Sequence, residues 1–264
     1  MPAGFFALKD AGTHASGWPI AIVGERDGAT MVLVPGATFT LGRDNAARNE
    51  GPSRSVKLGT FYMDQHEVIN AQFDRYRRAA HQASANEKGD SGDSDPNRPV
   101  VMVTHGEAAA YAAWAGKALP TEAQWELAAR TTDGRLHPWG ADPPSWEKHR
   151  EARQVDPVFS FLRDMSPYGA FDLAGNVWEW TADGYDIKMY QSIKNGQANP
   201  TGPTRAAERS VRGGSKDWLS TWRAGVKPET RLPYLGFRCV LSVEDLPQGQ
   251  APGQGKAARG PIPF

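Results

Sequence analysis

The chain has 264 residues, of which 39% are hydrophobic, and its 30 basic side chains balance its 30 acidic ones. This length fits one large domain or two small ones. A formal net charge of zero gives no electrostatic reason to expect nucleic acid or an anionic membrane as a partner. No apolar run approaches the roughly 20 residues that a membrane-spanning helix needs. Residues 1–10 contain no long apolar stretch, so no signal peptide is visible and we expect a cytoplasmic protein.

The chain contains one cysteine, Cys239. A single thiol cannot form an intramolecular disulfide, a zinc site with several cysteine ligands or a two-cysteine copper site. Cys239 follows Gly236-Phe237-Arg238 in an apolar pattern, and free cysteines are usually buried. We therefore expect Cys239 in the core.

The N-terminal part of the chain predicts short strands. Residues 1–28 are polar and glycine-rich with one short apolar run, and they predict an arm or an edge strand. Strand-like apolar patterns, the first two separated by a Pro-Gly turn, cover residues 31–34, 37–42 and 55–63.

A helix is predicted next, with Asn70 as its N-terminal cap and with Phe73 and Tyr76 on its buried face. The polar residues 81–98 predict a loop.

Two further helices have clear start signals. Thr104 and Glu107 form a Thr-x-x-Glu capping box, and Gly116 provides a stop. Thr121 and Gln124 repeat the box before a second apolar helical segment.

The run Trp178-Glu179-Trp180 places a carboxylate between two large indoles. Indole rings bury apolar area, so this segment indicates the edge of a core. An isolated buried carboxylate is very costly, and Glu179 therefore requires an ion-pair partner, several hydrogen bonds or a cation.

Helical patterns cluster in the middle of the chain and strands occur at both ends, the last ones at residues 210–212 and 235–241. This distribution favours an α+β fold with long loops. The predicted organisation is an N-terminal arm (1–28), one domain (29–242) and a Pro/Gly-rich tail (243–264).

Five motifs occur in one order and carry a resemblance to a known family. They are Leu119 to Glu126 (LPTEAQWE), Pro138 to Gly140 (PWG), Gly175 to Trp180 (GNVWEW), Arg212 to Ser215 (RGGS) and Gly236 to Arg238 (GFR). Together they resemble the sulfatase-modifying factor family, the formylglycine-generating-enzyme domain, over roughly residues 29–242. The resemblance implies an elaborated C-type-lectin-like fold, with a small twisted antiparallel sheet, two helices and long loops.

The resemblance also implies structural calcium. The family's ligand segment maps here to Gly175, Asn176, Val177 and Glu179. Oxygen ligands from carbonyls and a carboxylate suit Ca²⁺. In the alternative, backbone N–H groups or an arginine hold Glu179. The family's second calcium site uses an asparagine and an aspartate, and residues 143–164 contain no asparagine.

The family's oxidase binds Cu(I) through two cysteines shortly after Gly-Gly-Ser, because soft thiolates suit Cu(I). Residues 213–238 contain no cysteine. We therefore expect no copper and no formylglycine-generating oxidase activity, so the chain is predicted to be a pseudoenzyme of the family.

Two classes of function follow. In the first, the chain binds a protein, peptide or small molecule, or serves as an accessory domain, through Ser215, Trp218, Trp222, Arg223, Arg231 and Tyr234. Aromatic side chains in such loops form rigid anchors, although Trp218 and Trp222 would equally complete a core. In the second, it is a divergent sulfatase-modifying oxidoreductase, or another enzyme that uses a different site on the same fold.

Overall fold

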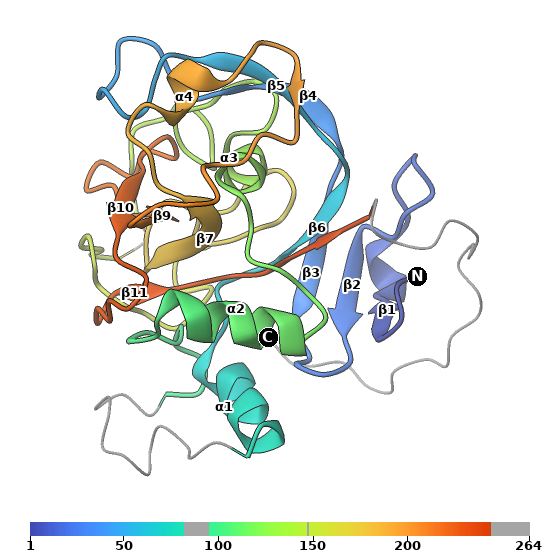
Figure 1. Cartoon of the computed structure of the whole chain (residues 1–264). Helices are drawn as coiled ribbons and strands as arrows, with labels where there is room; N and C mark the ends of the chain where they lie inside the picture. The colour runs from blue at the N-terminus through green and yellow to red at the C-terminus, as the bar shows by residue number, and fades with distance from the viewer. Residues whose placement is uncertain (82–94, 147, 244–264) are drawn as a thin grey trace.

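The computed structural model describes residues 1–81, 95–146 and 148–243. These residues form three sheets and short helices joined by long loops (Figure 1). The largest sheet is antiparallel throughout, in the order β1-β2-β3-β6-β12. Its strands are β1 (Phe5–Ala7), β2 (Ala21–Gly24), β3 (Thr30–Val34), β6 (Phe61–Asp64) and β12 (Val240–Ser242).

Two smaller sheets complete the strand content of the described residues. The four-stranded sheet has the order β10-β9-β7-β11 and the three-stranded sheet the order β4-β5-β8. Their strands are β7 (Trp178–Gly184), β9 (Arg209–Arg212), β10 (Ala224–Val226), β11 (Leu235–Gly236), β4 (Ala37–Leu41), β5 (Arg54–Leu58) and β8 (Gln197–Ala198). The α+β prediction is confirmed. The structure adds two parallel pairs to the expected antiparallel sheet, because the two-residue strands β11 and β8 pair in parallel at sheet edges.

The helices are α1 (Asn70–Ala79), α2 (His105–Trp114), α3 (Glu122–Arg130) and α4 (Met189–Ser192), with a 3₁₀ turn at Lys9–Ala11. Both predicted capping boxes form. Thr104 Oγ1 accepts a hydrogen bond from Glu107 N at 3.2 Å, and Thr121 Oγ1 accepts one from Gln124 N at 3.1 Å. Each bond satisfies an N–H group that the first helical turn leaves without a partner.

The start of α1 differs from the prediction. Ile69 is the capping residue, and its N–H donates to Gln72 Oε1 at 3.1 Å. Asn70 is the first helical residue, and its side chain donates instead to Asp95 O at 3.0 Å. The Asn70 side chain, which could cap the helix in isolation, therefore makes a long-range hydrogen bond instead.

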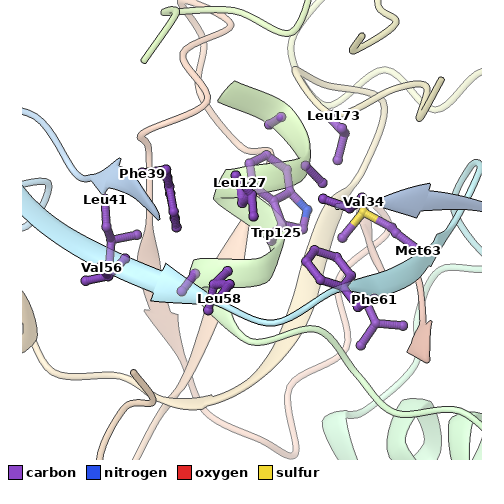
Figure 2. Close-up of a cluster of buried hydrophobic side chains, with 14 of the residues drawn as sticks. Val34, Phe39, Leu41, Val56, Leu58, Phe61, Met63, Trp125, Leu127 and Leu173 are labelled. Carbon is purple, nitrogen blue, oxygen red and sulfur yellow. The ribbon is translucent and has the colours of Figure 1, made fainter. Parts of the chain in front are cut away.

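The main hydrophobic core lies around α3, which contacts β4, β7 and β9. Figure 2 shows Trp125 and Leu127 of α3 among side chains from β3, β4, β5 and β6. On β4 and β5, four side chains that alternate with exposed ones are at most 3% exposed, as the strand period of two predicts, namely Phe39, Leu41, Val56 and Leu58. The helix is therefore fixed against several strands, and β7 and β9 lie directly beside it.

Both ends of the described chain join the five-stranded sheet. Residues 235–241, predicted as one strand, divide into β11 beside β7 and the start of β12 beside β6 (Figure 1). The strand is interrupted where Phe237, Arg238 and Cys239, all 0% exposed, pass through the core. Residues 1–28 place β1 and β2 at the edge of this sheet.

The predicted loop 81–98 and tail 243–264 fall largely outside the described residues, which end at Val243. Within the described part of the chain, no helix is long and apolar enough to cross a bilayer.

Candidate functional site

Glu179, the second residue of β7, has both carboxylate oxygens in use. Arg238 Nε lies 2.8 Å from Glu179 Oε2, and Arg238 Nη2 lies 2.8 Å from Oε1. Trp125 Nε1 donates a third hydrogen bond to Oε2 at 2.9 Å. All three side chains are 0% exposed. A bidentate arginine therefore supplies the positive charge that this buried carboxylate requires.

This arrangement fits the arginine alternative and does not fit calcium ligation by Glu179. A cation there would have to displace one of the present donors and would lie beside a guanidinium of the same charge. Asn176 Oδ1 accepts a 2.8 Å hydrogen bond from Asp156 N. Within the described ranges, no cluster of three or more His, Cys, Asp or Glu side chains is arranged to hold a metal. The calcium set of Gly175, Asn176, Val177 and Glu179 stays a prediction.

A hollow of about 190 Å³, counted with the space that opens to solvent, lies where β7 begins and β9 ends. Its lining comes from three segments, namely Gly175, Asn176 and Trp178; Gly213, Gly214, Ser215 and Trp218; and Ala152 with Arg153. Antiparallel pairing of β7 with β9, in register at Glu179 and Arg212, brings the first two segments together.

Two glycines allow indole rings to lie against the backbone at this hollow. A Cβ atom on Gly214 would overlap the rings of Trp178 and Trp222. A Cβ atom on Gly175 would overlap the ring of Trp218. The glycines of two family-like motifs thus have a packing role here, because only a residue without a side chain fits.

Trp178 connects several side chains at the rim. Its ring centroid lies 4.9 Å from that of Trp222 and 5.1 Å from that of Tyr234. The guanidinium of Arg153 lies 5.2 Å from the centroid of Trp178 and 4.9 Å from that of Tyr234. These distances are within the range of cation–π attraction, so Arg153 is held at the hollow by aromatic faces.

Two buried donors at the hollow have no acceptor. Trp178 Nε1 and Asn176 Nδ2 make no hydrogen bond within the described part of the chain. The bond from Asp156 N to Asn176 Oδ1 fixes the amide orientation, which leaves Nδ2 as the unused donor. A buried donor without an acceptor costs about 1–3 kcal/mol, and an acceptor that reached it would remove that cost.

The structure brings four of the six predicted ligand-binding residues together. Ser215 and Trp218 line the hollow. Trp222 and Tyr234 pack against Trp178 at its rim. Trp218 is 8% exposed, so it contributes to the core as well as to the lining.

The other two predicted residues form ion pairs elsewhere. Arg223 is 1% exposed, and its Nε and Nη2 atoms each lie 2.6 Å from an oxygen of Glu122. Arg231 Nη1 lies 2.7 Å from Glu107 Oε2 at the surface. Arg223 is therefore a core residue, because its guanidinium forms an ion pair with the buried Glu122, which is distant in the sequence.

Sequence reasoning missed the segment that supplies Ala152 and Arg153. Arg150 holds this segment in place, with its guanidinium 4.4 Å from the ring centroid of Trp146 and 4.9 Å from that of Trp218. Its Nη1 also donates to Asp164 Oδ2 at 2.8 Å. These residues lie in a Pro-rich stretch without clear periodicity, so the only available signal was its arginines and tryptophans.

The thiol chemistry of the family's oxidase has no counterpart at this hollow. Cys239 is 0% exposed and lies between β11 and β12, and its N–H donates to Asp64 Oδ2 at 2.8 Å. Burial raises the pKa of this thiol well above its ordinary value. A buried, protonated thiol is a poor nucleophile and a poor metal ligand.

Comparison with known proteins shows the family to which the chain belongs. The family profile described as sulfatase-modifying factor enzyme 1-like domain matches residues 22–243. The formylglycine-generating enzyme of Thermomonospora curvata is 28% identical, over 80% of this chain and 92% of that protein. A Bos taurus protein named inactive C-alpha-formylglycine-generating enzyme 2 is also 28% identical, over 88% of this chain and 93% of that protein.

The solved structure of PvdO from Pseudomonas aeruginosa superimposes with a TM-score of 0.63 at 24% identity, over 83% of this chain and 96% of that one. That similarity confirms the fold. With a family match that covers most of its residues, the chain belongs to the sulfatase-modifying factor family and has the fold of its formylglycine-generating-enzyme-like members.

Proposed function

We propose that this chain is a non-oxidase member of its family, an accessory or binding domain that holds a ligand in the hollow beside Gly214 and Ser215. One observation carries the proposal. The hollow is lined by aromatic rings, by Asn176 and by Trp178, it lies at the Gly-Gly-Ser motif, and the Asn176 and Trp178 side chains each have a buried donor without an acceptor. The same segment of the chain contains no cysteine.

The physical character of the hollow supports binding. Trp178 and Trp218 line the hollow with large, rigid rings, which lose little conformational entropy when a ligand packs against them. Small-molecule sites are concave and mostly apolar, with a few polar groups that orient the ligand. The two tryptophan rings, the two N–H donors and the Ser215 hydroxyl supply both kinds of group here.

The alternative function, a divergent sulfatase-modifying oxidoreductase, requires a redox centre. Thiolates are the ligands that Cu(I) prefers, and residues 213–238 supply none. The name of the inactive Bos taurus relative also supports a non-catalytic role, because it records a family member without the activity.

Binding can be tested with nuclear magnetic resonance of the indole N–H groups. A set of N-acetylated amino acids, each as the free acid and as the amide, is titrated into ¹⁵N-labelled protein. The Trp178 signal, assigned by its loss in Trp178→Phe, is expected to move on binding. Ala152 is exposed and lines the hollow, so Ala152→Trp is expected to block the change. If no member of the set moves this signal, the proposal is wrong.

The matched control is Ala3→Trp, which adds the same side chain at an exposed alanine next to β1, at the far edge of the five-stranded sheet (Figure 1). This variant is expected to bind as the wild type does. Equal loss of binding in both variants would show that the added tryptophan acts by destabilising the fold and would remove the support for this site.

A second experiment addresses the oxidoreductase alternative. Oxygen uptake is measured with Cu(I) and a peptide that contains Cys-x-x-x-Arg, and no copper-dependent turnover is expected. Turnover that survives Cys239→Ser would overturn the non-oxidase assignment.

A further inference from the structure

We infer that the ligand of this hollow presents a carboxylate, bound by Arg153 and by the N–H groups of Asn176 and Trp178. The inference rests on the proposed binding function and specifies the chemistry that the site recognises. All three residues line the hollow, and they offer hydrogen-bond donors of the kind that a carboxylate accepts.

The charge at the hollow is positive. Among its nine lining residues Arg153 is the only charged one. Arg153 is exposed, and no carboxylate within the described ranges forms an ion pair with it. The faces of Trp178 and Tyr234 hold the guanidinium at the rim but leave its N–H groups available. A positioned arginine without a carboxylate partner is suited to bind a planar anion through two parallel hydrogen bonds.

The two neutral donors favour an acceptor without protons of its own. Asn176 is 4% exposed, and its Nδ2 has no acceptor among the described residues, nor has the buried Trp178 Nε1. A carboxylate has about four lone-pair sites and no donor, so it can satisfy both N–H groups and still face Arg153. An amide of the same size has one acceptor oxygen, and its NH₂ group would meet these donors with the wrong polarity.

Nearby acidic groups do not occupy the hollow. Asp156 approaches Asn176 through its backbone N–H, and its carboxylate lies 3.8 Å from Lys148 Nζ. Asp217 is exposed and follows Ser215 in the loop. Neither side chain lines the hollow. The single positive charge of Arg153 matches a carboxylate better than it matches a phosphate dianion.

The decisive experiment compares N-acetylglycine with N-acetylglycinamide by titration of the wild-type protein. The two probes differ in the terminal group alone, and we expect the acid to bind at least about tenfold more tightly, as hydrogen bonds to charged groups are the stronger ones. Equal affinities would leave the binding function in place and overturn the carboxylate assignment. Failure of both probes and of every larger N-acetylated acid and amide would instead count against the binding function itself.

Two variants test the residues. Arg153→Gln is expected to weaken binding of N-acetylglycine by about tenfold and to leave N-acetylglycinamide nearly unchanged. Lys216→Gln removes the same charge from an exposed residue that adjoins Ser215 without lining the hollow, and an effect below about twofold is expected. Equal losses in the two variants would mean that general electrostatic attraction explains the preference for the acid, and the assignment of Arg153 would be wrong.

A carboxylate can come from a small acid or from the end of a polypeptide. Acetyl-Ala-Ala-Ala-Gly is therefore titrated as the acid and as the amide. Binding of the peptide acid at least as tightly as N-acetylglycine supports recognition of a chain end. Exclusion of the peptide, with N-acetylglycine still bound, supports a small carboxylic acid.

Discussion

Trp178 and Glu179 are neighbours in β7, but the Glu179 carboxylate is fully hydrogen-bonded and the Trp178 indole N–H is not. Glu179 points into the core, where Arg238 and Trp125 use both of its oxygens. Trp178 lines the hollow, and its Nε1 has no acceptor among the described residues. Successive residues of a strand face opposite sides, so one dipeptide supplies both environments.

A second comparison concerns three indoles close to one another in the fold. Trp125 Nε1 donates to Glu179, and Trp180 Nε1 donates to Val103 O at 3.0 Å. Trp178 alone of these three has a buried N–H without an acceptor. The fold thus satisfies the indoles that serve stability and leaves unsatisfied the one at the hollow. The proposed binding role of the hollow predicts such a difference.

The largest effect on stability is expected when the buried ion pair between Arg238 and Glu179 is broken. Arg238→Met leaves the Glu179 carboxylate buried without its cation, and breaking a buried pair in this way typically costs about 3–5 kcal/mol. The free energy of unfolding, measured by urea denaturation, is expected to fall by that amount. Arg231→Met is the matched control, because Arg231 forms a surface pair with Glu107 whose expected contribution is about 1 kcal/mol or less. Equal losses would contradict the buried role of Arg238.

The packing of indole rings against Gly214 at the hollow is tested by Gly214→Ala. The added Cβ atom would overlap the rings of Trp178 and Trp222, so a loss of about 1–3 kcal/mol in the free energy of unfolding is expected. Gly106→Ala provides the control, because a Cβ atom there meets no atom within 4 Å and alanine favours the helix α2. The control is expected to be neutral or slightly stabilising. An unchanged Trp178 indole signal in Gly214→Ala would contradict the packing described for the hollow.

Local signals in the sequence predicted more of this fold than of its site. The two capping boxes depend on residues three positions apart, and both form as expected. The division of residues 235–241 between two sheets could not be predicted, because it depends on β7 and β6 far away in the sequence. The core position of Arg223 could not be predicted for the same reason, because its partner Glu122 lies 101 positions away in the sequence.

Only part of the candidate site could be predicted from the sequence. The prediction located Ser215, from a family-like motif, and Trp218, from the aromatic loop that follows it, and both line the hollow. Arg153 comes from a segment without helical or strand periodicity, and aromatic side chains with Arg150 hold it in place. No local pattern specifies such contacts, so the charged member of the site appears only in three dimensions.

A smaller, pH-dependent effect distinguishes the half-buried imidazole of His66 from an exposed one. Burial lowers the pKa of His66 to about 4. The unfolded chain binds the proton near pH 6.5, so His66 contributes stability above that pH and loses it as the pH falls toward about 4. His66→Gln is expected to reduce the fall in the free energy of unfolding between about pH 7 and pH 5 by about 1–2 kcal/mol. His149→Gln, whose side chain is 80% exposed, is the control and is expected to leave the fall unchanged.

The smallest expected effect concerns calcium. Because Arg238 and Trp125 already use both oxygens of Glu179, we expect removal of calcium with a chelator to leave the unfolding temperature unchanged. Differential scanning calorimetry with and without added Ca²⁺ measures this. A ligand that binds only the native state raises stability with its concentration, so bound calcium would be visible as a concentration-dependent rise. Such a rise, if Glu179→Gln abolishes it, would show that the carboxylate exchanges Arg238 for the ion and would support the calcium set predicted at this strand.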